Sequence, residues 1–174
     1  MLQLSNSLQN IPVMSLRTSN QVATAVAPII NPKNLKIEGF WCQDLYENKQ
    51  LVLLTLDIRD TLPQGFAIND HENLAEPDEL IRLSEVLEMN FQPIGKPVYT
   101  LSKEKVGKVV DYALESTTFY IQKLYVGRPF FKSLTSGQLS VDRTQIIEIT
   151  PQKIIIQEIL KPKKAGVPAA APTA

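Results

Sequence analysis

Ile11-Pro-Val-Met-Ser-Leu16 returns later in the chain as Lys96-Pro-Val-Tyr-Thr-Leu101. The residues that follow each copy also run in parallel. The aligned pairs are Val22 with Val106, Val26 with Val110, Leu35 with Phe119, Ile37 with Ile121 and Trp41 with Tyr125. Self-similarity of this kind is the sequence signature of a repeated structural unit. The chain is therefore predicted to contain two copies of one small unit.

Each copy reads as a series of short strands. Pro12 and Pro97 stand at strand starts, where the missing N–H of proline costs no ladder hydrogen bond. Apolar and β-branched runs separated by polar turns follow in both copies. We expect strands over residues 12–16, 22–30, 35–42, 51–58 and 66–69, and again over 97–101, 106–114, 118–126, 138–149 and 153–159. Short strands at close spacing, twice over, predict a mainly β protein of two small β-barrels.

An amphipathic segment separates the copies. Glu76-Pro-Asp-Glu79 is typical of a helix start, because proline at the first helical position loses no hydrogen bond and acidic residues suit the positive end of the helix dipole. Leu80, Leu83 and Leu87 then share one face. We predict a connecting helix over 77–90 between a first unit at 1–76 and a second at 91–160. The Pro- and Ala-rich tail, 161–174, is expected to be disordered.

Composition narrows the class of protein. The 174 residues carry equal numbers of acidic and basic side chains, which excludes the broad basic field of a dedicated nucleic-acid binder. Cys42 is the only cysteine and cannot form an internal disulfide. No signal-peptide pattern is seen, and no apolar run approaches the ~20 residues that cross a bilayer. We expect a cytoplasmic protein without a transmembrane segment.

The second copy resembles the PRC-barrel family, named after the photosynthetic reaction-centre H subunit, through Gly95-Lys-Pro-Val98 followed by Lys105-Val-Gly-Lys-Val-Val-Asp111. The first copy looks like the same module, with Ala23 where the second has Gly107. The resemblance implies two tandem PRC-barrel-like units. It also implies a binding module, since family members hold partner proteins, assist ribosomal subunit assembly or stabilise membrane complexes.

Residues that suggest catalysis have simpler interpretations. His71, the only histidine, lies among acidic residues; a metal site or a titrating switch is one reading, and an exposed loop leading into the helix is the one we favour. Cys42 is expected to be buried and inert. Asp57 and Arg59 are expected to form an exposed ion pair on one strand face. We therefore predict no catalytic, cofactor or metal site, and no enzyme.

Two segments are candidates for contact with a partner. Phe130 and Phe131 are adjacent in a loop between Arg128 and Lys132, so one phenylalanine can serve as an exposed anchor; that both fold back onto the barrel is an equal alternative. A basic cluster near the C-terminus can touch an acidic surface, RNA or anionic lipid, although a solvated tail is the favoured reading. Its members are Lys161, Lys163 and Lys164.

The function expected from these features is a non-enzymatic protein-interaction or adaptor module whose partner is another protein. The alternative is an RNA-associated or ribosome-assembly factor that recognises a ribosomal protein or ribosomal RNA. The sequence leaves open the identity of the partner, the oligomeric state and the biological process.

Overall fold

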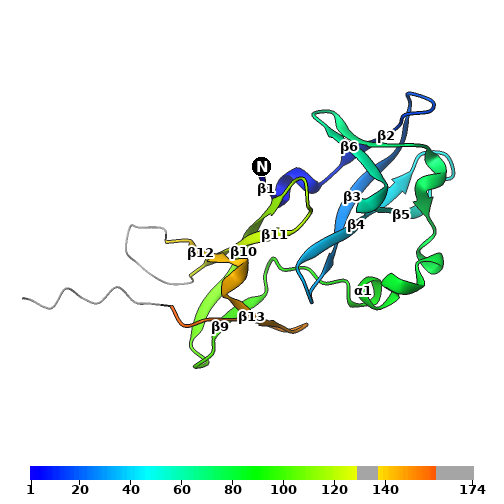
Figure 1. The fold of residues 1–174 in the computed structure, drawn as a ribbon. Coiled ribbons are helices and arrows are strands. Elements are labelled where there is room, and N and C mark those ends of the chain that lie inside the picture. The colour runs from blue at the N-terminus through cyan, green and yellow to red at the C-terminus, as the bar shows by residue number, and fades with distance from the viewer. Residues whose placement is uncertain (129–136, 160–174) are drawn as a thin grey trace, which may run out of the picture.

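The computed structural model describes residues 1–128 and 137–159 (Figure 1). It confirms the expectation of a mainly β protein. The strands of these residues form two sheets of seven strands each. Helical structure within these residues is limited to one short α-helix and several 3-10 turns.

The first sheet has the strand order β6-β7-β2-β3-β4-β5-β8. Its neighbours pair antiparallel, except for β2 and β7, which are parallel. The strands are β2 (Ile11–Ser15), β3 (Gln21–Asn31), β4 (Lys36–Asp44), β5 (Gln50–Leu54), β6 (Ile58–Leu62), β7 (Gly65–Ile68) and β8 (Leu74–Ala75).

The second sheet has the order β12-β11-β10-β9-β14-β13, and β1 also pairs with β10. Strands β9 to β14 repeat the pairing of β2 to β7, including the parallel pair, here β14 with β9. Pro12 and Pro97 lie on the corresponding strands β2 and β9. The strands are β1 (Leu2–Leu4), β9 (Pro97–Thr100), β10 (Lys105–Glu115), β11 (Ile121–Gly127), β12 (Leu139–Asp142), β13 (Ile146–Ile149) and β14 (Ile154–Ile156).

Both sheets are open at the same place. Within the described ranges, no ladder joins β5 to β6 or β12 to β13. A 3-10 turn makes each of these connections: η2 (Thr55–Asp57) in the first sheet and η6 (Arg143–Gln145) in the second. The expected single strand over 138–149 is therefore divided into β12 and β13 by η6.

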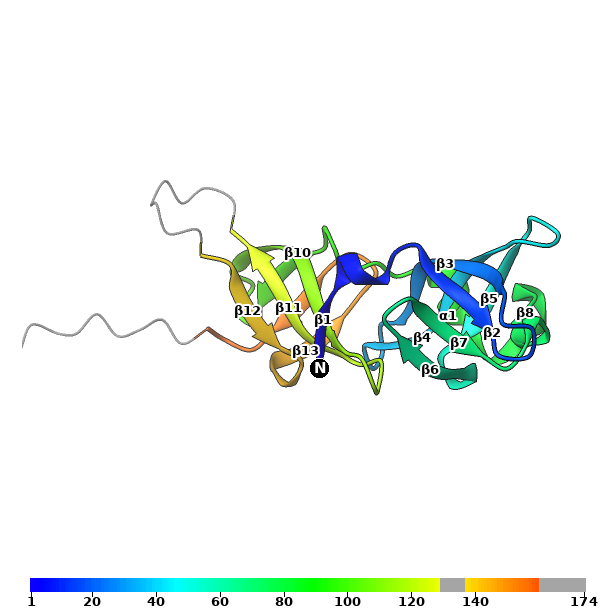
Figure 2. The same cartoon turned by 90° about the horizontal axis from the view of Figure 1, so that it is seen from above.

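The N-terminal strand corrects the expected first unit of residues 1–76. β1 pairs with the end of β10 in the second sheet, with Leu2 opposite Glu115 and Leu4 opposite Ala113. Figure 2 shows β1 lying beside β10. On this side of β10, the strand β9 pairs with the first residues only, so the end of β10 can pair with β1. The first residues of the chain therefore belong to the second sheet.

The connecting segment is not the continuous helix expected over 77–90. It consists of the 3-10 turns η4 (Pro77–Glu79) and η5 (Ile81–Leu83), followed by the helix α1 (Ser84–Met89). Leu80 has a non-helical backbone, with φ −89° and ψ 62°, which separates the two turns. The leucines nevertheless pack as an apolar face against the outer side of the first sheet, in a cluster that contains Ile29, Trp41, Val52, Leu54, Leu80, Leu83, Val86 and Leu87.

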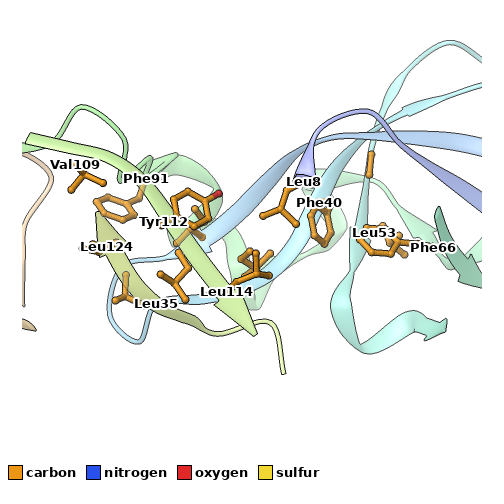
Figure 3. Packing of buried hydrophobic residues seen from close by; sticks show 14 of the residues in the cluster. Leu8, Leu35, Phe40, Leu53, Phe66, Phe91, Val109, Tyr112, Leu114 and Leu124 are labelled. Atoms are coloured by element: carbon orange, nitrogen blue, oxygen red, sulfur yellow. The ribbon is translucent and has the colours of Figure 1, made fainter. Parts of the chain in front are cut away.

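A single hydrophobic core runs through both sheets (Figure 3). Where they meet, the N–H of Ile37 donates to the carbonyl of Phe119 (2.8 Å), and the N–H of Ile121 donates to the carbonyl of Leu35 (2.9 Å). The Phe119 ring also contacts the Phe40 ring of the first sheet, with centroids 6.1 Å apart. Shared core and exchanged backbone bonds make the two sheets one packed body.

Candidate functional site

A groove lies between the turn η2 and the connecting segment. It has a volume of about 450 Å³ and is lined by Lys36, Glu38, Leu54, Thr55, Leu56, Glu79, Leu80, Ile81, Arg82 and Leu83. Leu56 is 73% exposed and Ile81 is 79% exposed. Large aliphatic side chains exposed to this degree on both sides of one groove are typical of a protein contact surface.

Local structure explains why both side chains face solvent. The corner η2 interrupts strand alternation after β5, and the hydroxyl of Thr55 donates to the carbonyl of Glu38 (3.3 Å), which ties the corner to β4. In the connecting segment, Leu80 and Leu83 pack onto the outer side of the sheet. Ile81 lies between them in the chain and faces outward as a result.

Charged side chains of both signs surround the apolar centre. Lys36 forms an ion pair with Glu38 (3.6 Å) on β4, and Glu79 and Arg82 are exposed on the connecting segment. An apolar centre with a charged rim is the usual anatomy of a protein interface. The only hydroxyl of the lining belongs to Thr55, and the lining contains no histidine or cysteine. The groove is thus suited to accept an apolar side chain.

The structure corrects the interpretation of His71 as part of a solvated loop. Its Nε2 lies 2.7 Å from Oδ1 of Asp44, whose side chain is fully buried, and its ring packs edge-to-face with the Tyr46 ring, with centroids 4.7 Å apart. Asp70 caps the 3-10 turn η3 (His71–Asn73) and pairs with Arg17 (2.6 Å). Within the described ranges, no group of three His, Cys, Asp or Glu residues is placed to hold a metal.

Burial and hydrogen bonding determine the pKa values of Asp44 and Cys42, the two buried titratable side chains of β4. Burial acts to raise the pKa of Asp44, but hydrogen bonds from the Glu47 backbone, the His71 side chain and the Tyr46 backbone together lower that pKa below its ordinary value of 3.8. Burial raises the pKa of Cys42 to about 12, against a smaller opposing effect of the Leu53 backbone. Cys42 is therefore an unreactive thiol, as expected from its sequence context.

Asp44→Asn is expected to lower the melting temperature by about 3–8 °C at neutral pH, because it removes the charge from a buried, hydrogen-bonded pair. Since the pKa of Asp44 is depressed in the folded state, its contribution is complete above pH 3.8 and is lost as the pH falls through the lower folded value. The difference in melting temperature between the parent and the variant should therefore become smaller as the pH falls below 3.8. Asp60→Asn, at an exposed position, is the control; a difference that is constant with pH would contradict the prediction.

The structure places one of the predicted contact residues. Arg128 is exposed directly after β11. Its expected companions Phe130, Phe131 and Lys132 lie outside the described residues, as do Lys161, Lys163 and Lys164.

The expected ion pair of Asp57 and Arg59 is wrong. Asp57 ends the turn η2, whereas Arg59 is on β6, so the two residues do not share a strand face. The structure shows no ion pair between these two described side chains.

Sequence reasoning missed Leu56 and Ile81. Leu56 falls two residues after Leu54 in the expected strand over 51–58, so strand alternation predicts that both face the same way. Alignment of the two copies could have identified Leu56. Its position in the first copy corresponds to Thr144 in the second, in the middle of η6. An apolar residue where the other copy has a polar one on an exposed corner indicates an exposed apolar side chain.

No protein-family model matches the chain. Comparison with curated proteins also finds no match. None of the helices within 1–128 and 137–159 combines the length and apolar character needed to cross a membrane.

Proposed function

We propose that the chain is a non-enzymatic protein-interaction module, an adaptor made of two PRC-barrel-like units, and that its groove accepts an apolar side chain of a partner protein. The observation that carries the proposal is the position of Leu56 and Ile81. Apart from Met1, they are the most exposed large hydrophobic residues of the described ranges, and both line the same groove. Apolar anchors within a polar rim supply most of the energy of protein binding.

Two observations support the description of each unit as a small barrel. The strands β9 to β14 repeat the pairing of β2 to β7, and both long strands carry a register shift at the same place. In β3 the shift falls at Val26, and in β10 it falls at the matched Val110. Such bulges bend and twist a strand and so help a sheet to curl around its own core.

Affinity capture from a lysate of the native cell tests the proposal, with the full chain as bait at two salt concentrations and with nuclease treatment in parallel. Leu56→Ser/Ile81→Ser should reduce capture of the partner by about 10-fold or more, since it removes two exposed apolar anchors. The fold should be unaffected, because both side chains are largely exposed. Leu101→Ser/Ile147→Ser removes two exposed aliphatic side chains that do not line the groove and is the matched control.

A partner that is retained at high salt and after nuclease treatment, and that is lost only with the groove variant, supports the proposal. Capture that depends on RNA, or that weakens steeply as salt rises, would instead support an RNA-associated or ribosome-assembly factor, because binding through phosphate contacts is strongly salt-dependent. Equal capture by the groove variant and the control variant would show that the groove is not the contact surface.

A further inference from the structure

The two sheets differ at one edge. In the first sheet, β8 covers the free side of β5, with Leu74 opposite Leu53 and Ala75 opposite Val52. β12 takes the place of β5 in the second sheet, because β11 pairs with β12 as β4 pairs with β5. Within the described ranges, β12 pairs only with β11. Its other side forms no ladder within the described residues; the N–H of Asp142 donates to Oε1 of Gln145 (2.7 Å), so the part of the edge before Asp142 is the template for a further strand.

β8 shows what kind of segment suits this position. Its backbone pairs with β5, and the side chain of Leu74 is buried in the core. An ion pair between Lys49, just before β5, and Glu76, just after β8, joins the two segments (2.5 Å). The occupant is therefore an extended strand with one buried apolar side chain and one charged side chain at its end.

A cleft lies beside β12 in the second sheet. It has a volume of about 570 Å³ and is lined by Leu139, Ser140, Val141, Gln145, Ile156, Gln157, Glu158 and Ile159. Val141 and Ile156 are buried core residues, and Leu139 and Ile159 are partly buried against the core. The walls therefore offer apolar contact to one further side chain, next to a free strand edge.

The charge at this edge is opposite to that beside β8. The residue before β12 that corresponds to Lys49 is Gly137, so this cation is absent from the second copy. Instead, Glu158 is exposed in the lining of the cleft, and its Oε1 accepts a hydrogen bond from the N–H of Ser102 (2.6 Å). Asp142 ends β12, and hydrogen bonds from the backbone and hydroxyl of Thr144 lower the pKa of its carboxyl group. A basic residue on the occupant matches the carboxylate of Glu158 in the cleft.

The sequence after Ile159 is a poor source of this strand. In the first copy, β8 is reached through residues 69–73, whose turn η3 is closed by a capping box. In the second copy, only Leu160 and Lys161 separate Ile159 from Pro162. Proline cannot donate a ladder hydrogen bond, so a strand drawn from this sequence would lack the donor at Pro162.

We propose that the free edge of β12 is a docking site for an extended segment of a partner protein, which adds as an antiparallel strand, places an apolar side chain against Val141 and Ile156, and sets a lysine or arginine beside Glu158. Main-chain hydrogen bonds and one side-chain pocket are the usual means by which a peptide adds to a sheet edge. The site rests on the proposed interaction function and gives it a second contact surface, distinct from the groove.

NMR titration of the ¹⁵N-labelled full chain tests the site with a nine-residue peptide of alternating lysine and valine. Resonances of β12 and of residues 156–159 should shift. A peptide with glutamate in place of lysine should bind at least about 10-fold more weakly, and N-methylation of alternate peptide amides should abolish binding, because it removes ladder donors. Glu158→Lys should reverse the preference between the two peptides, whereas Glu148→Lys, an exposed position on β13, should not.

Shifts confined to other surfaces, or no difference between the two peptides, would overturn the proposal. So would nuclear Overhauser contacts between residues 160–164 and β12 in the free protein, because they would show that the chain fills the edge itself. The capture experiment with Leu56→Ser/Ile81→Ser is independent of this titration. If capture of the partner is lost with the groove variant but the peptide causes no shifts at β12, the docking site is refuted and the proposed interaction function still stands.

Discussion

Phe40→Ala should lower the free energy of unfolding by about 3–5 kcal/mol. Phe40 is fully buried, and its ring contacts Phe66 with centroids 4.9 Å apart and Phe119 with centroids 6.1 Å apart. Phe66 belongs to the first sheet and Phe119 to the second half of the chain, so the substitution leaves a cavity close to the junction of the sheets. Urea denaturation measures the loss.

The same experiment tests whether the two sheets unfold together. Trp41, the only tryptophan, reports on the first sheet by fluorescence, and far-ultraviolet circular dichroism reports on both sheets. The two transitions should coincide in the parent protein, as two-state unfolding requires. Phe40→Leu is the control and should cost distinctly less, because it keeps most of the side-chain volume. A Phe40→Ala loss below about 1 kcal/mol, or two separate transitions in the parent, would contradict a shared core.

Gly107→Ala should lower the free energy of unfolding by about 3–5 kcal/mol. A Cβ atom at this position would lie 2.0 Å from the carbonyl oxygen of Gly127, and 3.1 Å from a methyl group of Val126. A backbone atom cannot rotate away, so β10 or β11 must shift. For a chain of this size the loss corresponds to a melting temperature about 6–20 °C lower, which calorimetry measures.

Gly95→Ala separates steric conflict from backbone preference. Gly95 has φ +87°, but a Cβ atom there would meet nothing within 4 Å. The variant should cost only about 1 kcal/mol, the usual penalty of a side chain at positive φ. If both variants lowered the melting temperature equally, close approach of the two strands would not be the reason for glycine at position 107.

The repeat allowed most strands to be placed along the chain, but not their pairing within the sheets. The expected apolar runs fall on β2 to β5, on β7 and on β9 to β14, whereas β6 was expected only at its first residue, Ile58. The pairing of β1 with β10 joins residues more than a hundred positions apart, and nothing in Leu2-Gln-Leu4 distinguishes one sheet from the other. The helix over 77–90 was expected from the helix-start pattern of Glu76-Pro-Asp-Glu79 and from the leucine spacing. Three residues with the same spacing also fit a chain of short turns that packs on the same sheet.

The candidate site could not be predicted, because it depends on contacts between residues that are distant in the sequence. Leu56 fitted a strand pattern, and only the corner η2 turns it outward. The bond from His71 to Asp44 joins residues 27 positions apart, so the acidic neighbours of His71 in the sequence gave the wrong surroundings. The expectation for Cys42 succeeded because burial on an apolar strand is a local property.

The segment that precedes each copy packs on the long strand of the other copy: β1 lies on β10, and α1 contacts β3. Together with the backbone bonds exchanged between Ile37 and Phe119 and between Ile121 and Leu35, this is the arrangement of a symmetric dimer held within one polypeptide. Covalent linkage makes its assembly intramolecular, so dilution cannot separate the halves. Each half is also free to diverge, and one partner site can be lost from one half while it is kept in the other.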